Sequence, residues 1–172
     1  EVQQARRRRL APALDAVGVG ADEIGQAHPE HPLHLVGRRL ELELGVDAPE
    51  IVDQAVAAVQ AELDAPKLAE VLELKPGMTV ADIGAGGGAM TVVLGKWIGS
   101  GHVYATDIGE RPLGLIRDYV NKESLTNVTV VHGAEATTNL PPACCDAVFL
   151  RHVYHHITAV DAFNKSLYDS LK

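Results

Sequence analysis

Two acidic residues and a run of glycines near the middle of the chain have the spacing of a cofactor site. Asp82 stands two residues before Gly84, glycines recur through 84–88, and Asp107 follows 23 residues after Gly84. Glycine tolerates positive φ angles and lets a ligand approach the bare backbone. A carboxylate at the later position can accept hydrogen bonds from ribose hydroxyls. This pattern predicts a site for a cofactor that contains a nucleoside.

The glycines must lie between a strand and a helix for this chemistry to work. The apolar run 78–83, which follows the turn signal Pro76-Gly77, predicts a buried strand. The apolar spacing after the glycines predicts a helix over 88–98. The first turn of such a helix has N–H groups without partners inside the helix, and these would face the ligand.

Two cofactor classes use a strand, a glycine turn and a helix in this order. Gly84-x-Gly86-x-x-Ala89 satisfies the dinucleotide pattern, and Asp107 lies near the expected position of the ribose-binding acid of an NAD site. Asp82 is not part of that pattern, and its carboxylate suits a ligand that carries an ammonium group. An NAD-binding oxidoreductase therefore stays open as an alternative.

Four further blocks follow the stretch 78–88, namely VYATDIGE (103–110), VTVVHGAE (128–135), LPPACCDAVFLRHVYHHI (140–157) and LYDSLK (167–172). In their order and spacing the five blocks, which cover about residues 66–172, resemble the class I S-adenosylmethionine-dependent methyltransferases, and most of all the small-molecule group that includes ubiquinone and menaquinone methylases. The resemblance implies S-adenosylmethionine as the cofactor and a small molecule as the methyl acceptor.

Strands and helices alternate after residue 78, which predicts a parallel sheet with right-handed crossovers. The resemblance implies a Rossmann-like, doubly wound α/β sheet with strand order 3-2-1-4, and a ligand above the carboxyl ends of strands one and four. The expected strands are 78–83, 102–107, 127–132 and 145–150, and the expected helices are 88–98, 111–123 and 158–171.

The resemblance also implies roles for individual residues. Asp107 would accept both ribose hydroxyls, and Ile108 would pack on the adenine face. Relatives usually have Gly-Asp after the third strand, with the Asp on the adenine amino group, whereas this chain has Gly133-Ala134-Glu135. Either Glu135 takes over that contact or backbone and packing hold the adenine. The expected cofactor-binding residues are Asp82, Gly84, Ala85, Gly86, Asp107, Ile108, Ala134, Glu135 and Arg151.

Basic residues follow the fourth strand. Arg151 stands where relatives usually have a small polar residue, which favours an anionic group on the substrate. His152, His155 and His156 would share one face if this segment were a helix. We predict no metal site there, because no carboxylate or cysteine completes a ligand set. One of these histidines as a general base stays open, since a base matters only for a hydroxyl or protonated amine acceptor.

Composition excludes several other classes of protein. The net charge of −8 argues against a broad nucleic-acid surface, and no apolar stretch approaches the ~20 residues that span a bilayer. The adjacent cysteines Cys144 and Cys145 cannot form a disulfide that links distant parts of the fold. The simpler interpretation is that both are small buried side chains in a protein of a reducing compartment. We therefore expect a cytoplasmic protein; because the chain begins at Glu1 without a methionine, an exported form stays open.

The sequence predicts two regions, a helical N-terminal extension over 1–65 and the methyltransferase-like domain over 66–172. Weak helical patterns cover 2–17 and 35–44. The histidines of HPEHPLH (28–34) would be spaced ~9 Å apart in polyproline geometry, too far for one zinc ion. Asp47-x-x-Glu50 predicts the start of a helix that ends near Leu63, and Asp64-Ala-Pro-Lys predicts the start of a second helix over 67–74.

The chain ends at Lys172, where relatives continue with three more strands. Strand four would then be an edge with an apolar face, and an exposed edge promotes aggregation. We expect an oligomeric partner or a following C-terminal segment to cover it. A truncated module that binds the cofactor without turnover is accordingly the alternative to a methyltransferase that acts on a small molecule.

Overall fold

The computed structural model describes residues 48–172. The expected helices at 2–17 and 35–44 and the HPEHPLH histidines lie outside the described residues. The chain divides into two compact units, 1–60 and 61–172. The expected domain boundary after residue 65 stays a prediction.

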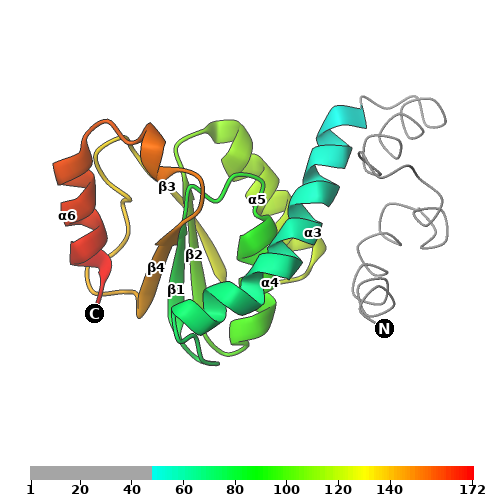
Figure 1. The fold of residues 1–172 in the computed structure, drawn as a ribbon, viewed down its shortest axis with the longest axis horizontal. Helices are drawn as coiled ribbons and strands as arrows, with labels where there is room; N and C mark the ends of the chain where they lie inside the picture. Colours follow the sequence, from blue (N-terminus) through cyan, green and yellow to red (C-terminus); the bar gives the residue numbers. More distant parts are fainter. Residues whose placement is uncertain (1–47) are drawn as a thin grey trace. The chain divides into compact units, whose positions relative to one another are not determined.

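Four parallel strands form a single sheet, as the sequence predicts. They are β1 (Thr79–Ile83), β2 (His102–Asp107), β3 (Val128–His132) and β4 (Ala147–Leu150). Their order is β3-β2-β1-β4, which confirms the doubly wound Rossmann-like arrangement (Figure 1). The winding direction reverses between β1 and β4, so a crevice is expected at the carboxyl ends of these strands.

Helices cover both faces of the sheet (Figure 1). The helices α4 (Ala89–Ile98) and α5 (Glu110–Lys122) lie on one face and α6 (Val160–Ser170) on the other. Each face has its own apolar core. The core under α4 and α5 contains Val92, Ala105, Leu113, Ile116 and Val120. The core under α6 contains Ala81, Ile83, Cys145 and Phe163.

The two helices expected at 51–63 and 67–74 are one helix, α3 (Ala48–Val71), so the predicted second helix start is wrong. Pro66 lies inside α3. A proline in this position has no N–H for the helix ladder and favours a kink, and the α3 ribbon bends in its C-terminal part (Figure 1). Helix continuation is favoured by a stripe of alanines at every fourth position, all buried, namely Ala61, Ala65 and Ala69.

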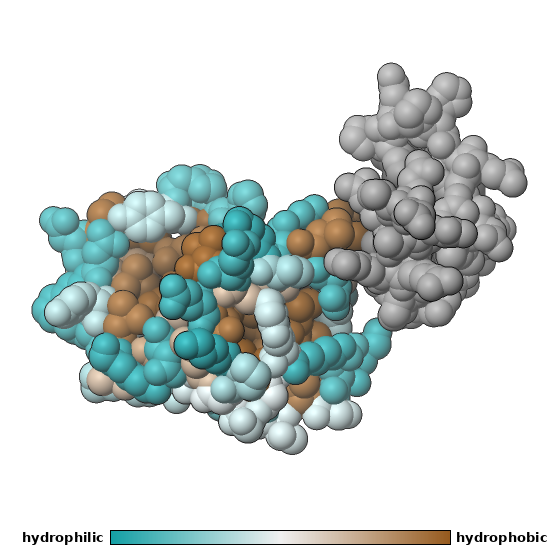
Figure 2. Space-filling view, turned by 60° about the horizontal axis from the view of Figure 1, so that its bottom comes forward, coloured by the Kyte–Doolittle hydropathy of each residue, from teal (hydrophilic) through white to brown (hydrophobic). Residues whose placement is uncertain are grey.

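Strand β4 is the edge that the sequence predicts, but its face is partly covered. Phe163 and Leu167 of α6 pack in the core on that side. Beyond α6 the backbone turns back, and Leu171 forms a parallel bridge with Cys145. Within β4, Ala147 and Phe149 are buried. Figure 2 shows apolar patches between polar side chains on one face of the molecule. A covering partner or segment stays a prediction.

Candidate functional site

The carboxyl ends of the strands bring five of the nine predicted cofactor-binding residues to one cavity. The other four, Asp82, Ala85, Gly86 and Arg151, are not part of its lining. In the sheet register, Ile83 pairs with Thr106 on one side and with Leu150 on the other. The loops that follow β1, β2 and β4 therefore start side by side. A cavity of about 160 Å³ opens there, and its lining includes Gly84, Asp107, Ile108, Gly133, Ala134 and Glu135.

Asp107 ties the glycine loop to the end of β2. Its Oδ2 accepts a hydrogen bond from the Gly86 N–H at 3.0 Å. Its Oδ1 accepts bonds from the N–H groups of Ile108 at 2.8 Å and Gly109 at 3.1 Å. A carboxylate has about four acceptor positions, so three are occupied by the backbone and the fourth is left for a ligand hydroxyl. The side chain is partly exposed and lines the cavity.

Asp82 lies in the neighbouring strand, in a very different environment. Its side chain is 3% exposed, and its Oδ2 accepts a hydrogen bond from the Thr91 hydroxyl at 2.7 Å. Burial raises the pKa of Asp82 to about 6, while the Thr91 bond and the charge of Arg151 act against that rise. At neutral pH this is a buried carboxylate with few donors, and a positive charge on a ligand above it would be favoured.

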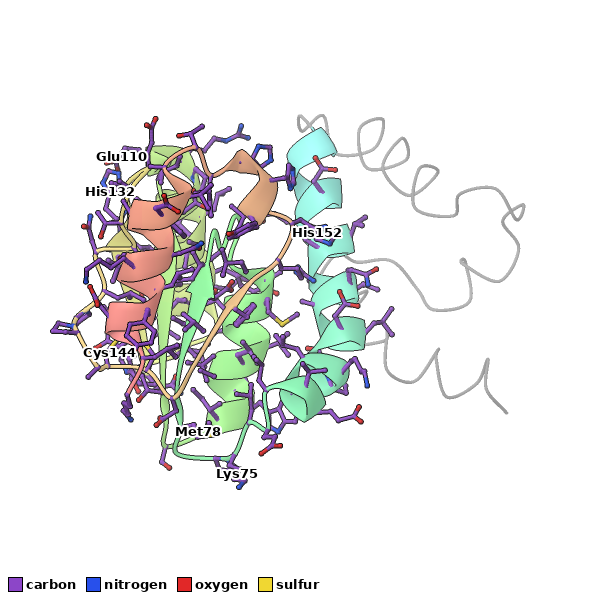
Figure 3. The ribbon with its side chains drawn as sticks, turned by 60° about the vertical axis from the view of Figure 1, so that its left-hand side comes forward. Lys75, Met78, Glu110, His132, Cys144 and His152 are labelled. Carbon is purple, nitrogen blue, oxygen red and sulfur yellow. The ribbon has the colours of Figure 1, made fainter. Side chains whose placement is uncertain are left out.

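The side of the cavity formed by the ends of β2 and β3 is suited to a flat, mostly apolar group. Ile108 is 62% exposed although it is apolar, and it lines the cavity together with Ala134 and Glu135. His132, which the sequence analysis did not single out, supports this rim. Its Nδ1 lies 3.3 Å from Oε1 of Glu110 and its Nε2 lies 3.2 Å from the Ile108 carbonyl oxygen, and Figure 3 shows Glu110 and His132 together.

Val153 fills the space above the first glycine. A Cβ added to Gly84 would lie 2.6 Å from Cγ2 of Val153, and Gly84 has a φ of +70°. Both observations require glycine at this position. The cavity is smaller than the ~300–1,000 Å³ of ordinary ligand sites, so it would enclose a whole nucleoside cofactor only if its walls moved, and Val153 is part of those walls.

The histidines after β4 do not form the shared face that a helix would give. The segment contains only a short 3-10 turn, Tyr154–His156, and His152 precedes it with a φ of +57°. His156 lines the cavity, and its ring lies 3.9 Å from that of His155. Between residues 48 and 172 no group of three His, Cys, Asp or Glu side chains could hold a metal ion.

The cysteine pair lies at the opposite end of the sheet. The two Sγ atoms are 2.8 Å apart, and burial raises the pKa of the Cys145 thiol well above its usual range. Cys144 lies far from Glu110 and His132 in Figure 3. Next to the pair, Asp146 accepts the Thr79 N–H at 2.7 Å and pairs with Lys172, contacts that hold its pKa below the usual range. This corner of the fold is structural.

A comparison with protein families identifies the chain. A family model described as a methyltransferase domain matches residues 81–172, more than half of the chain. The chain belongs to this methyltransferase family. It has the class I S-adenosylmethionine-dependent fold, and the cofactor of this class is S-adenosylmethionine. The NAD alternative is thereby set aside.

Known relatives of this chain include both sequences and structures. The chain is 34% identical to a SAM-dependent methyltransferase from Aquifex aeolicus with a TM-score of 0.60, covering 63% of this chain and 58% of that one. The chain is 27% identical to a SAM-dependent O-methyltransferase from Thermotoga maritima, with a TM-score of 0.52. That match covers 63% of this chain and 40% of the other.

A protein-L-isoaspartate O-methyltransferase from Methanothermobacter thermautotrophicus is 35% identical over 71 residues, which are 38% of this chain and 31% of that protein. The chain thus spans under two thirds of the length of these relatives.

Proposed function

We propose that this chain contributes the cofactor site of a methyltransferase that transfers a methyl group from S-adenosylmethionine to a small molecule. The observation that carries the proposal is the cavity formed by Asp107, Ile108 and the residues after β3. A carboxylate with one open acceptor position beside an exposed apolar side chain suits a ribose joined to a flat base. Asp82, beneath the loop that begins at Gly84, suits the positively charged amino-acid end.

The cofactor supplies an activated methyl group on a positive sulfur, so the protein chiefly has to hold and align the reactants. In this proposal Asp107 accepts one ribose hydroxyl at its open acceptor position, Ile108 packs on the adenine, and Glu135 accepts a hydrogen bond from the adenine amino group. Fixing the reacting groups in line and excluding water account for much of the acceleration in such a transfer. A base is required only when the acceptor must lose a proton, and His156 lines the same cavity.

The small-molecule acceptor is supported by the resemblance of the sequence blocks to quinone methylases. A protein acceptor is the second candidate, because one relative is a protein-L-isoaspartate O-methyltransferase. The third candidate is a module that binds the cofactor without turnover, motivated by Ala134, which has no acceptor side chain where relatives have Asp. A cytoplasmic location also stays a prediction; among the described helices none is long and apolar enough to cross a membrane.

Calorimetric titration with S-adenosylhomocysteine tests the cofactor site, with NADH as the control ligand. We expect binding of the homocysteine compound and none of NADH, and the opposite result would contradict the proposal. Transfer of a radiolabelled methyl group into a size-fractionated lysate then separates the three candidates. Label in small molecules supports the first candidate, label in proteins supports the second, and no label supports the third.

A further inference from the structure

Arg151 is the first residue after β4, and it lies beside the first glycine of the site. Leu150 pairs with Ile83 in the sheet, so the chain leaves β4 level with the point where Gly84 leaves β1. The positive charge of Arg151 also acts on the buried carboxylate of Asp82 and lowers its pKa. The backbone of Arg151 therefore leaves the sheet next to Gly84 and near Asp82, although its side chain is not among those that line the cavity.

The guanidinium group is only partly used by the protein. In the part of the chain that the structure describes, Nη1 of Arg151 donates to Oδ2 of Asp64 in α3 at 2.9 Å. The Arg151 side chain is 32% exposed and the Asp64 side chain is 41% exposed. Ion pairs as exposed as this one contribute little to stability. Arginine has five N–H donors in a planar fork that matches a carboxylate or phosphate with two parallel bonds. Arg151 can thus exchange Asp64 for another oxyanion at a small cost.

We propose that Arg151 binds an oxyanion of a ligand in the cleft, a carboxylate or a phosphate, and that Asp64 is the counter-ion it releases. The inference rests on the proposed function, since it names the chemistry recognised at the same site. Two sources can supply the oxyanion. One is the α-carboxylate of the cofactor's methionine end, and the other is an anionic group on the methyl acceptor.

The two sources are separated by titrating the wild type and Arg151→Gln with four probes. S-Adenosylhomocysteine has the amino-acid end, and 5′-methylthioadenosine is the matching nucleoside without it. Benzoate and inorganic phosphate are then added to protein saturated with S-adenosylhomocysteine. If the cofactor supplies the oxyanion, the variant loses about tenfold in affinity for S-adenosylhomocysteine and none for methylthioadenosine. If the acceptor supplies it, nucleoside binding is unchanged and binding of benzoate or phosphate is lost.

Two further variants make the result specific to the guanidinium group. Arg151→Lys keeps the charge but not the fork, so its affinity should lie between those of the wild type and the Gln variant. Asp64→Asn removes the competing carboxylate and should raise affinity for the oxyanion probe a few-fold. Circular dichroism checks that each variant is folded.

The proposal is overturned if Arg151→Gln changes none of the four titrations, or if it weakens S-adenosylhomocysteine and methylthioadenosine equally. In either case the wild type still binds S-adenosylhomocysteine, so the proposed function stands. Failure of the wild type to bind S-adenosylhomocysteine at all would instead remove the proposed function, together with the inference that rests on it.

Discussion

The two halves of the cleft are built from the same kinds of residue and differ in how ready they are for a ligand. The half at the ends of β2 and β3 is open, with Asp107 held by three backbone N–H groups and Ile108 exposed beside it. In the half at the ends of β1 and β4, Val153 lies against Gly84 and Asp82 is buried.

This difference shows how environment divides two aspartates on adjacent strands into separate roles. Asp107 is partly exposed and already bonded to backbone N–H groups, so it suits neutral ligand hydroxyls. Asp82 is desolvated and has one neutral donor, so it suits a cation. Under the proposed function, the half that would bind the nucleoside is therefore preformed, and the half that would bind the amino-acid end is expected to become complete only when the ligand brings its charge and the loop shifts.

The largest effect is expected from removing the carboxylate of the preformed half. Asp107→Ala loses the ribose contact and the bonds that hold Gly86, Ile108 and Gly109 in place. Hydrogen bonds to a charged group contribute about 1.5–3 kcal/mol each, so affinity for S-adenosylhomocysteine should fall about 100-fold or more by calorimetry. Asp118→Ala, an exposed aspartate on α5, is the matched control. Equal affinities for the two variants would show that the preformed half does not bind the nucleoside.

The next effect concerns the filled half. Gly84→Ala adds a Cβ that meets Val153 and forces a side chain onto a φ of +70°. We expect a loss of roughly 2–4 kcal/mol in the free energy of unfolding, measured by denaturant titration. In the double variant with Val153→Ala, the part of this loss that comes from the clash should be recovered. The part that comes from the positive φ angle of residue 84 should remain.

A matched glycine is available for that experiment. Gly114 lies inside α5, and a Cβ there meets nothing within 4 Å. Gly114→Ala should stabilise the protein by about 1 kcal/mol, the difference in helix propensity between the two residues. If Gly84→Ala were as harmless as Gly114→Ala, Val153 would not occupy the space above Gly84.

Asp82→Asn tests whether the buried carboxylate of Asp82 makes the stability of the protein depend on pH. Burial raises the pKa of Asp82 from its ordinary value of 3.8 to about 6 in the folded protein. The folded state therefore binds more protons between about pH 4 and 6, and this group's contribution to stability falls as pH rises through that window. The shift corresponds to a few kcal/mol at most. Asn removes the buried charge and should raise stability at pH 7 by about 1–3 kcal/mol.

The same variant should lower affinity for S-adenosylhomocysteine, because the ligand's ammonium group loses its carboxylate. For stability, the free energy of unfolding is measured for the wild type and for Asp82→Asn at several pH values between 4 and 8. The difference between the two proteins at each pH isolates the titration of Asp82. A difference that does not change with pH would contradict the assignment of a raised pKa to Asp82.

The smallest expected effect is at the adenine rim. Glu135→Ala should lower the affinity for S-adenosylhomocysteine about fivefold. Glu135 is exposed to solvent, so its hydrogen bond is expected to contribute only about 1 kcal/mol, less than the bonds to the partly buried Asp107. The analogue S-inosylhomocysteine has no amino group on its base and should bind the wild type and the variant equally. If Glu135→Ala leaves both affinities unchanged, backbone and packing hold the adenine, as the second interpretation of Ala134 and Glu135 requires.

The sequence predicts most of the sheet because its signals are local. Apolar runs bounded by glycine turns place β1 and β2 within a residue of their observed bounds, and the order 3-2-1-4 follows from the resemblance. The continuous helix α3 could not be predicted, because Asp64-Ala-Pro-Lys has the local pattern of a helix start. Buried alanines on one face of α3 favour continuation, and their burial is a tertiary effect that local pattern does not contain.

The site was predicted less completely than the sheet. Asp107, Ile108 and Glu135 line the cavity, and the sequence predicts them as cofactor-binding residues because glycines and acidic residues follow the expected strands. Val153 and His132 were missed, because an apolar residue in a loop and a histidine at a strand end carry no chemical signature of their own. Only the register that sets Leu150 beside Ile83 brings Val153 onto Gly84.

A crystal structure of the chain soaked with S-adenosylhomocysteine tests the central claim most directly. The account predicts the ribose on Asp107, the adenine between Ile108 and Glu135, and the loop with Val153 moved away from Gly84 to admit the amino-acid end. An empty cavity, or the ligand bound elsewhere with Val153 still against Gly84, would contradict it.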